Sequence, residues 1–224
     1  MRVCAVIPAY NEADVIGDLV AAVRQHVDQV IVVDDGSVDG TGARAAGAGA
    51  SCLRFEENQG KGAAVRHALA RVAPGAFTHV LFMDGDGQHR PEDIPSLLQE
   101  ARVSGADLVI GTRPLDQARM PRSRHLSNSL GSRVASRLVG RPIRDSQSGF
   151  RLVRLASLAA LSLRSRGYEI EMEVLIKLCG TGAQVSQTPV ALVYDGGRAR
   201  SKMRPIRDTV RICLWSVAFR YFGA

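Results

Sequence analysis

The first 113 residues alternate short apolar runs with helix-like stretches, and this alternation limits the possible folds more than any other feature of the chain. The apolar runs end in polar clusters and cover residues 4–9, 29–37, 51–55, 79–88 and 106–113, as expected of buried strands. Between them, helices are predicted over residues 13–26, 41–50, 63–72 and 92–103. Strands and helices that alternate at this spacing predict an α/β fold with a mainly parallel, doubly wound sheet.

Polar motifs follow four of the predicted strands at the point where each strand ends. They are Tyr-Asn-Glu at 10–12, Asp-Asp-Gly-Ser at 34–37, Asp-Gly-Asp-Gly-Gln-His at 84–89 and Gly-Thr-Arg at 111–113. Open α/β sheets bind their ligands at the carboxyl ends of the strands. We therefore expect one crevice to collect all four motifs.

The second half of the chain is less regular and is expected to extend the same sheet. Helices are predicted over 126–139, 154–163, 169–179 and 206–222, strands within 144–152 and 184–194, and loops over 114–125 and 195–205. A length of 224 residues suits one sizeable domain better than two. Residues 1–224 are thus predicted to form a single domain.

Charge is distributed unevenly between the two halves. Residues 1–111 hold nine basic and 15 acidic residues, whereas residues 112–224 hold 20 basic and seven acidic ones. The basic half favours an anionic partner, which could be nucleic acid, a membrane surface or a phosphorylated substrate. Most of its basic residues are Arg, which suits bidentate recognition of phosphate. Aromatic residues are only 5% and form no stacking platform, so nucleic acid is not expected.

Cysteine spacing and hydropathy exclude further classes of protein. The four Cys residues lie far apart without a CxxC pair, which argues against a zinc site or a disulfide framework and favours a reducing, cytoplasmic compartment. We expect neither a signal peptide nor a transmembrane helix. The apolar run at the N-terminus is too short for a signal peptide, and no apolar run reaches 18 residues.

The motif at 84–89 gives the sharpest chemical signal in the sequence. Asp84 and Asp86 follow a buried strand, and a turn there could direct Asp86 and Gln88 toward one point. Oxygen ligands of this kind suit a hard cation such as Mg²⁺ or Mn²⁺, which keeps open positions for substrate phosphates. The alternative is an ordinary polar turn that caps the next helix. His89 is interpreted as a positioning or capping residue.

Three other motifs have both a binding and a structural interpretation. Asp35 could accept hydrogen bonds from a nucleoside, or the Asp-Asp-Gly-Ser motif could form a simple Asx turn. Tyr10 and Glu12 offer a stacking ring and an acceptor, or they belong to a helix start capped by Asn11. Lys61 could lie near a phosphate or a base. Neither a P-loop nor a GxGxxG motif is present.

Several Arg residues of the second half could hold phosphate, although a solvated surface position is the commoner role for any one of them. Arg113 follows a predicted strand end, and Arg119, Arg122 and Arg124 lie in the next loop. Arg198, Arg200, Lys202, Arg204 and Arg207 lie in and just after a later Gly-rich segment.

Taken together, these motifs resemble the family 2 glycosyltransferases, specifically the polyprenyl-phosphate sugar synthases of the dolichol-phosphate mannose or glucose type. The matching strings are VIPAYNE (6–12), VVDDGSVDGT (32–41), NQGKGAAVRHAL (58–69), MDGDGQHRPED (83–93), GTR (111–113), DSQSGFRL (145–152) and SKM (201–203). They occur in the family's order and cover nearly the whole chain, so the ordered set is far more specific than any single string.

The resemblance implies a GT-A fold and an inverting transfer of a hexose from GDP-mannose or UDP-glucose to a polyprenyl phosphate. Residues 1–113 would bind the nucleotide sugar, and residues 114–224 the acceptor. Pro8, Tyr10, Glu12 and Asp35 would hold the nucleoside with Lys61 nearby, and Asp84, Asp86 and Gln88 would hold Mg²⁺ or Mn²⁺ and the diphosphate. Arg113 and Arg124, with Ser127 or Asn128 close by, would meet the acceptor phosphate, Asp145 and Gln147 would face the sugar, and Arg200 and Lys202 would form a late phosphate-binding loop.

The acceptor and the donor sugar stay open at this level. A polyprenyl phosphate is already an anionic nucleophile, so Asp145 would act as a base only if the acceptor were a hydroxyl. A family 2 enzyme with a soluble hydroxyl acceptor would share the first 113 residues. A nucleotidyltransferase would need a Gly-rich basic loop after the first strand, and a non-catalytic anion-binding module would not need the acidic motif.

Many members of the resembled group carry transmembrane helices after the catalytic domain, and none is predicted before Ala224. We therefore expect either a membrane-anchor partner or a peripheral protein at the cytoplasmic face of the membrane. The last predicted helix spaces Ile206, Val210, Cys213, Leu214, Val217 and Tyr221 along one stripe, beside Arg207, Arg211 and Arg220. This stripe could lie on an anionic membrane or pack on the domain's own core.

Overall fold

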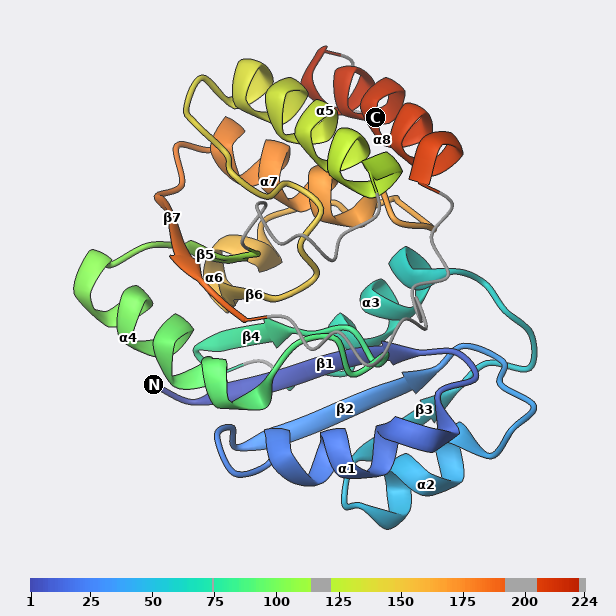
Figure 1. Cartoon of the computed structure of the whole chain (residues 1–224). Coiled ribbons are helices and arrows are strands. Elements are labelled where there is room, and N and C mark those ends of the chain that lie inside the picture. Colours follow the sequence, from blue (N-terminus) through green and yellow to red (C-terminus); the bar gives the residue numbers. More distant parts are fainter. Residues whose placement is uncertain (74, 114–121, 192–204, 222–224) are drawn as a thin grey trace.

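Seven strands form one mixed sheet in the order β3-β2-β1-β4-β6-β5-β7 (Figure 1). The structure is a computed structural model that describes residues 1–73, 75–113, 122–191 and 205–221. The strands are β1 (Val3–Ala9), β2 (Gln29–Asp34), β3 (Ser51–Arg54), β4 (His79–Phe82), β5 (Leu108–Thr112), β6 (Arg151–Arg154) and β7 (Val185–Pro189). Strands from the first and the second half of the chain thus share one sheet, as the sequence predicted.

Strand β6 runs antiparallel to both of its neighbours, β4 and β5, whereas the other strand pairs are parallel. The spacing of the first half predicts parallel strands and gives no sign of this insertion. Its cause lies at the carboxyl edge of the sheet. The chain returns to that edge at Asp145, which bonds the backbone N–H of Arg113 just beyond β5, so the strand that follows must run back in the opposite direction.

Helices cover both faces of the sheet. They are α1 (Ala13–Val23), α2 (Thr41–Gly47), α3 (Lys61–Leu69), α4 (Ile94–Ser104) after the short 3₁₀ turn Pro91–Asp93, α5 (Arg122–Val139), α6 (Leu155–Ala159), α7 (Ile170–Gly180) and α8 (Pro205–Tyr221). Strand β1 is buried on both faces, with Cys4 and Val6 in one core and Ala5 and Ile7 in the other. The first core also holds α3 and α5–α8, and the second holds α1, α2 and α4.

Several predicted elements are longer than the observed ones. The strand predicted over 29–37 ends at Asp34, where the Asp34 carboxylate accepts the backbone N–H of Ser37 and the chain turns. The strands predicted over 79–88 and 184–194 end at Phe82 and Pro189, and the helix predicted over 154–163 covers only Leu155–Ala159. The polar motifs therefore lie in the loops that follow the strands, where a ligand can reach them.

Helix α8 packs on α5 and α7 and adds a further layer to one side of the domain (Figure 1). It buries Ile212 and Phe219 in the core, whereas Val210, Leu214 and Tyr221 are exposed. The stripe predicted from the sequence thus faces outward at these positions and does not pack on the domain's own core. No helix in the described part of the chain is long and apolar enough to cross a membrane.

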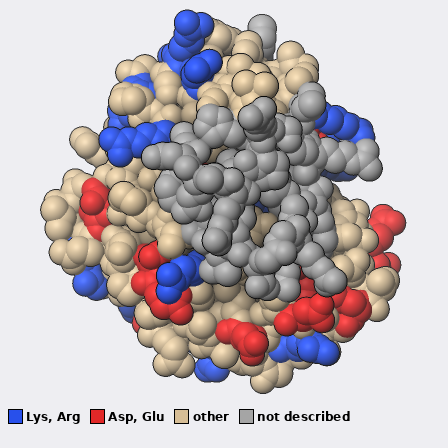
Figure 2. All heavy atoms as spheres, in the orientation of Figure 1, with Lys and Arg blue, Asp and Glu red and all other residues tan. Residues whose placement is uncertain are grey.

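Acidic side chains on the visible face lie mainly over the lower part, which holds α1, α2 and the strands β1–β3, with basic side chains among them (Figure 2). The charged side chains visible over the upper part, near α5 and α8, are mostly basic. The excess of basic residues in the second half of the sequence is therefore visible on this face.

Candidate active site

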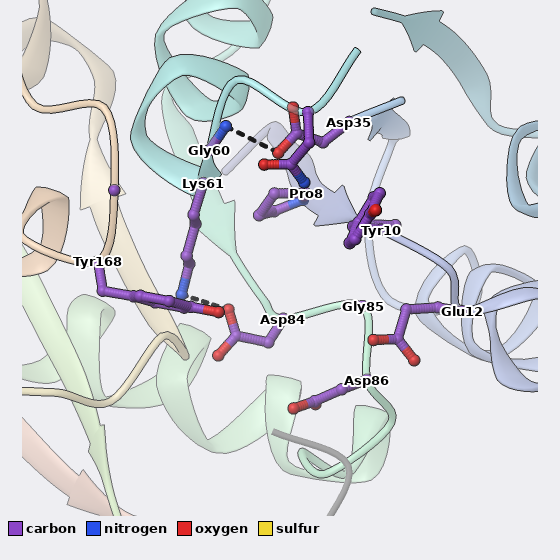
Figure 3. A pocket seen from close by; sticks show the side chains of 13 residues that line it. Pro8, Tyr10, Glu12, Asp35, Gly60, Lys61, Asp84, Gly85, Asp86 and Tyr168 are labelled. Atoms are coloured by element: carbon purple, nitrogen blue, oxygen red, sulfur yellow. Dashed lines mark hydrogen bonds and ion pairs between the residues drawn. The ribbon is translucent and has the colours of Figure 1, made fainter. Parts of the chain in front are cut away.

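A cavity of about 530 Å³ opens at the carboxyl ends of β1, β2 and β4 (Figure 3). Its walls come from the loops after these strands, from the start of α3 and from the loop before α7. The lining residues are Pro8, Ala9, Tyr10, Glu12, Asp35, Asn58, Gly60, Lys61, Asp84, Gly85, Asp86, Gly167 and Tyr168. Three of the four motifs that the sequence assigned to one crevice do share it, whereas Arg113 is not among the lining residues.

Strand register explains how the first and third motifs meet. Val6 pairs with Phe82 across the parallel strands β1 and β4, which brings Pro8 beside the start of the acidic motif. A Cβ on Gly85 would lie 3.0 Å from the Pro8 carbonyl oxygen. A glycine at position 85 therefore lets the acidic loop pass close to β1.

The loops after β1 and β2 are tied to each other by hydrogen bonds. The backbone N–H of Asn11 donates to Ser37 Oγ at 2.9 Å, and that of Glu12 donates to Thr41 Oγ1 at 2.8 Å. The Asn11 side chain accepts the N–H of Val38 and makes no cap for α1. Asn11 thus joins the two loops, which corrects the interpretation of this residue as a helix cap and leaves Tyr10 and Glu12 facing the cavity.

Asp35 links β2 to the start of α3. Its two carboxylate oxygens accept the backbone N–H groups of Gln59 and Gly60 at 2.7 and 2.9 Å. Burial raises the pKa of this carboxyl, and these two hydrogen bonds counteract the rise. Asp34 holds the turn through its bond to the N–H of Ser37, and Asp35 lines the cavity, so one acid of the motif has a structural role and its neighbour faces the site.

Two glycines let the start of α3 pack against the loop that carries Tyr168. Gly60 has φ +97°, and a Cβ there would lie 2.5 Å from the Arg166 carbonyl oxygen. A Cβ on Gly62 would lie 2.6 Å from the Ser165 carbonyl oxygen. The two glycines of the Gly-Lys-Gly motif therefore allow the backbone of α3 to lie close to the backbone of the loop before α7. This close packing directs Lys61 and Tyr168 into the same cavity.

Lys61 lies between two carboxylates. Its Nζ contacts Asp84 Oδ1 and lies 2.5 Å from Glu171 Oε1. Burial opposes the charge of this lysine, but the two acids outweigh burial and raise its pKa. Burial alone would raise the pKa of Asp84, and Lys61 reverses this effect so that the pKa is lowered. Asp84 is therefore a carboxylate that the protein itself neutralises.

The surroundings of Asp86 shift its pKa in the opposite direction from that of Asp84. Burial and the charges of Asp84 and Glu12 raise its pKa to about 6, although the N–H of Gln88 donates to Oδ1 at 3.0 Å. A half-buried carboxylate beside two like charges favours a bound cation, and its oxygen ligands fit a hard divalent ion. In the described residues no group of three or more His, Cys, Asp and Glu side chains is arranged to hold a metal. Asp84 and Asp86 therefore fit a site that substrate phosphates would complete.

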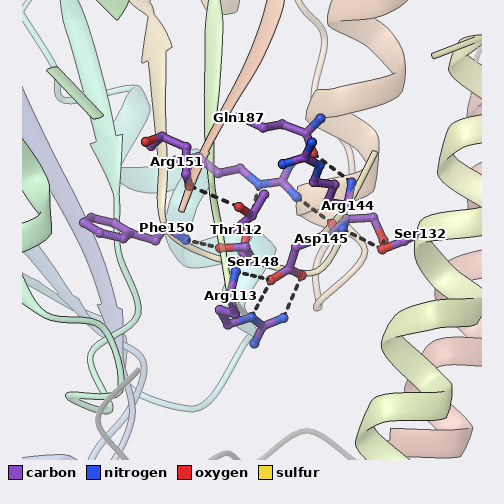
Figure 4. Close-up of polar contacts among 11 residues, drawn as sticks. Thr112, Arg113, Ser132, Arg144, Asp145, Ser148, Phe150, Arg151 and Gln187 are labelled. Atoms are coloured by element: carbon purple, nitrogen blue, oxygen red, sulfur yellow. Dashed lines mark hydrogen bonds and ion pairs between the residues drawn. The ribbon is translucent and has the colours of Figure 1, made fainter. Parts of the chain in front are cut away.

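Arg113 and Asp145 form a second polar centre (Figure 4). The guanidinium donates to both carboxylate oxygens, at 2.6 Å from Nε and 2.8 Å from Nη2. Asp145 is fully buried, which alone would raise its pKa, but Arg113 lowers it below the usual range. Arg113 is thus fixed by a carboxylate that stays ionised.

Arg151 fixes the loop 145–150 through hydrogen bonds to its backbone carbonyls. This side chain is almost fully buried and donates to the backbone carbonyls of Ser146, Ser148 and Glu171, at 2.5 to 2.7 Å. The amide of Gln147 donates to Thr209 Oγ1 of α8 at 3.2 Å, away from the cavity. Of the other predicted site residues, Gln88 does not line the cavity. Arg200, Lys202 and the side chain of Arg124 lie outside the described residues.

Sequence reasoning missed Tyr168 and Glu171. Tyr168 lines the cavity, and Glu171 is 8% exposed in the first turn of α7. Acids that recur at every second position of an otherwise apolar helix, as in residues 169–173, are a signal that could have found Glu171. An acid at such a position is buried and requires a partner.

A cavity at the carboxyl edge of an α/β sheet, lined by an acidic pair and a lysine, is typical of the ligand sites of α/β enzymes. Residues 4–161 match Glycosyl transferase family 2, so the chain belongs to glycosyltransferase family 2. It is a glycosyltransferase with a single α/β domain of the GT-A type.

Two relatives and one solved structure illustrate the similarity. The chain is 32% identical to the glycosyltransferase AglJ of Haloferax volcanii over 92% of this chain and 68% of the relative. It is 30% identical to the undecaprenyl-phosphate mannosyltransferase of Micrococcus luteus over 100% and 97%. Glucosyl-3-phosphoglycerate synthase from Mycobacterium tuberculosis, solved with Mn²⁺, UDP and glucosyl-3-phosphoglycerate, superposes with a TM-score of 0.72 at 23% identity, over 97% and 77%.

Proposed function

We propose that the protein transfers a hexose, mannose or glucose, from a nucleotide sugar to a polyprenyl phosphate with inversion at the anomeric carbon. The observation that carries the proposal is the cavity in which Asp35, Lys61, Asp84 and Asp86 face one another at the strand ends. The Micrococcus relative, which this chain matches along its whole length, supports the lipid acceptor.

The donor would occupy the cavity along the strand ends. Pro8, Tyr10, Glu12 and Asp35 would hold the nucleoside. A carboxylate has about four lone-pair sites, so Asp35 can still accept from a base or ribose while it holds two backbone N–H groups. Both uracil and guanine offer N–H donors, which leaves UDP-glucose and GDP-mannose as candidate donors.

Asp84 and Asp86 would hold a divalent cation, Mg²⁺ or Mn²⁺, together with the donor diphosphate. Such a cation offsets the negative charge that grows on a departing nucleoside diphosphate. Gln88 would act through its backbone N–H, which orients Asp86, and Lys61 contacts Asp84 in the structure.

The acceptor phosphate would meet Arg113 and Arg124. A lipid phosphate is ionised at neutral pH, so the enzyme needs to position and neutralise it more than to deprotonate it. The paired, fully buried Asp145 suits this mechanism, because it orients Arg113 and is a poor base in that state. Arg200 and Lys202 are proposed to contribute to phosphate binding, and Gln147 to the sugar site.

A peripheral position at the cytoplasmic face of a membrane would bring the lipid to this site. The exposed apolar side chains Leu126 and Leu130 of α5 and Val210, Leu214 and Tyr221 of α8 lie on two adjacent helices. Exposed arginines of the same helices surround them, a combination that suits an anionic lipid surface.

A transfer assay tests the proposal directly. GDP-mannose and UDP-glucose are each supplied with Mg²⁺ or Mn²⁺ and either a short-chain prenyl phosphate or a soluble sugar. We expect one donor to give a lipid-linked sugar with the prenyl phosphate alone. Transfer to the soluble sugar only would overturn the lipid acceptor and favour the alternative, a family 2 glycosyltransferase of glycan synthesis.

A further inference from the structure

Glu171 has no role in the proposed donor or acceptor site, yet it contacts the lysine at its centre. Lys61, Asp84 and Glu171 come from α3, the loop after β4 and the first turn of α7, and their side chains are 15%, 30% and 9% exposed. Figure 3 shows the Lys61 amine beside the Asp84 carboxylate, with Asp86 further along the same loop and Glu12 on the neighbouring segment before α1. One ammonium group therefore serves two carboxylates at the edge of the cavity.

The position of Lys61 conflicts with cation binding at Asp84. The lysine contacts Asp84 Oδ1, and a divalent cation at the same carboxylate would be repelled by the ammonium at short range. If Asp84 were the sole partner of Lys61, separating the two would leave a nearly buried ammonium group without a counter-charge, which is strongly unfavourable. Glu171 removes this obstacle, because it keeps Lys61 paired after Asp84 is released.

Glu171 is itself held in place. Its backbone carbonyl accepts Nη1 of the buried Arg151 at 2.6 Å. It also lies in the first turn of α7, where the helix dipole favours a negative charge. Gly149 completes the arrangement, since a Cβ there would overlap the Asp84 carboxylate.

We propose that Glu171 is a positioning residue that retains Lys61 so that Asp84 can exchange the lysine for a divalent cation. The inference rests on the proposed metal site and deepens it, since it assigns the residue that lowers the cost of filling that site. Lys61 is then an internal cation that neutralises Asp84 while the site is empty.

A double-mutant cycle on Mn²⁺ affinity tests the exchange. The free Mn²⁺ resonance is measured by electron paramagnetic resonance, with Mn²⁺ alone so that no contact of Lys61 with a nucleotide enters. The proteins are the wild type, Glu171→Gln, Lys61→Met and the double variant. We expect Glu171→Gln to weaken Mn²⁺ binding about tenfold in the wild type and less than about twofold in the Lys61→Met background.

The matched control is Glu169→Gln. Glu169 is also buried at the start of α7, but it pairs with Arg211 and not with Lys61, so its replacement should leave Mn²⁺ affinity unchanged. Circular dichroism and thermal melting verify that each variant is folded. The Glu171→Gln replacement is made both in the wild type and in the Lys61→Met background. A general loss of structure caused by this replacement would therefore lower Mn²⁺ affinity in both.

Two results would overturn the exchange. One is a Glu171→Gln variant that binds Mn²⁺ as tightly as the wild type. The other is an equal loss in both backgrounds, which would mean that Glu171 acts on the ion through its own charge and independently of Lys61. A wild type that binds no Mn²⁺ would overturn the metal site of the proposed function together with the exchange, and this result is distinguishable from the other two.

Discussion

At the scale of single residues, the site combines two carboxylates that the fold treats in opposite ways. Asp84 is neutralised by Lys61, whereas Asp86 lies near Asp84 and Glu12 and is held as an ion at some cost. A cost of this kind is typical of residues kept for function and not for stability.

Replacement of Asp86 by Asn should separate function from stability. Asp86 has its pKa raised to about 6, so the folded state releases this proton later than the unfolded state, and its ionisation destabilises the fold as the pH rises from about 4 to 6. Without added metal, we expect Asp86→Asn to melt at a higher temperature than the wild type at pH 8, with a difference that shrinks toward pH 4. Turnover should fall roughly 100-fold or more. Unchanged turnover would contradict the metal assignment.

Asp145→Asn tests the buried pair with Arg113. Removal of one partner leaves Arg113 without its counter-ion, and we expect a loss of about 3 kcal/mol in the free energy of unfolding, measured with urea. The pKa of Asp145 is lowered, so its contribution is present at neutral pH and is lost as the pH falls below the usual aspartate range. The control Glu92→Gln removes an exposed pair with Arg90 and should cost less than about 0.5 kcal/mol. Equal losses would contradict the structural role of Asp145.

At the scale of elements, the sequence predicts strands and motifs well and partners across the fold poorly. The helices of the first half and the presence of the strands follow from periodicity and turn residues, which are local, whereas three predicted strands extend past their observed ends. The antiparallel β6 and the contact of Glu171 with Lys61 depend on where the chain returns after α5, and no local pattern carries that information. Arg113, which the sequence offers for phosphate, is likewise fixed by a partner, Asp145, and nothing in the sequence pairs those two residues.

The packing of α3 against the loop before α7 makes a prediction at this scale. Gly62→Ala would force a Cβ against the Ser165 carbonyl and shift Tyr168, so we expect a loss of about 1–3 kcal/mol in unfolding free energy and a raised KM for the donor. The matched control is Gly47→Ala in α2, where a Cβ meets nothing within 4 Å and should be neutral or stabilise by up to about 1 kcal/mol. A Gly62→Ala protein with normal stability and KM would show that the contact is not needed.

At the scale of the whole molecule, the proposed function assigns roles to both the cavity and the outward face of α5 and α8. The cavity lies at the carboxyl edge, and the helix pair forms the outermost layer on one side of the sheet (Figure 1). Exposed apolar side chains are common on protein surfaces, but on α8 three of them recur at helical spacing, at Val210, Leu214 and Tyr221. The proposed membrane contact rests on this stripe, with Arg207 and Arg211 beside it.

Replacement of Leu214 and Leu130 by Glu tests this face. Each side chain is exposed, at 68% and 46%, so neither replacement should alter melting temperature or donor binding. Binding to vesicles that contain anionic lipid should fall, because each change removes apolar contact and adds a charge of the same sign as the lipid. Cosedimentation measures this loss, which we expect to be about tenfold for the double variant. Val103→Glu on α4, 75% exposed on the opposite side of the sheet, is the matched control and should bind vesicles normally. Equal binding by all three proteins would place the membrane contact elsewhere.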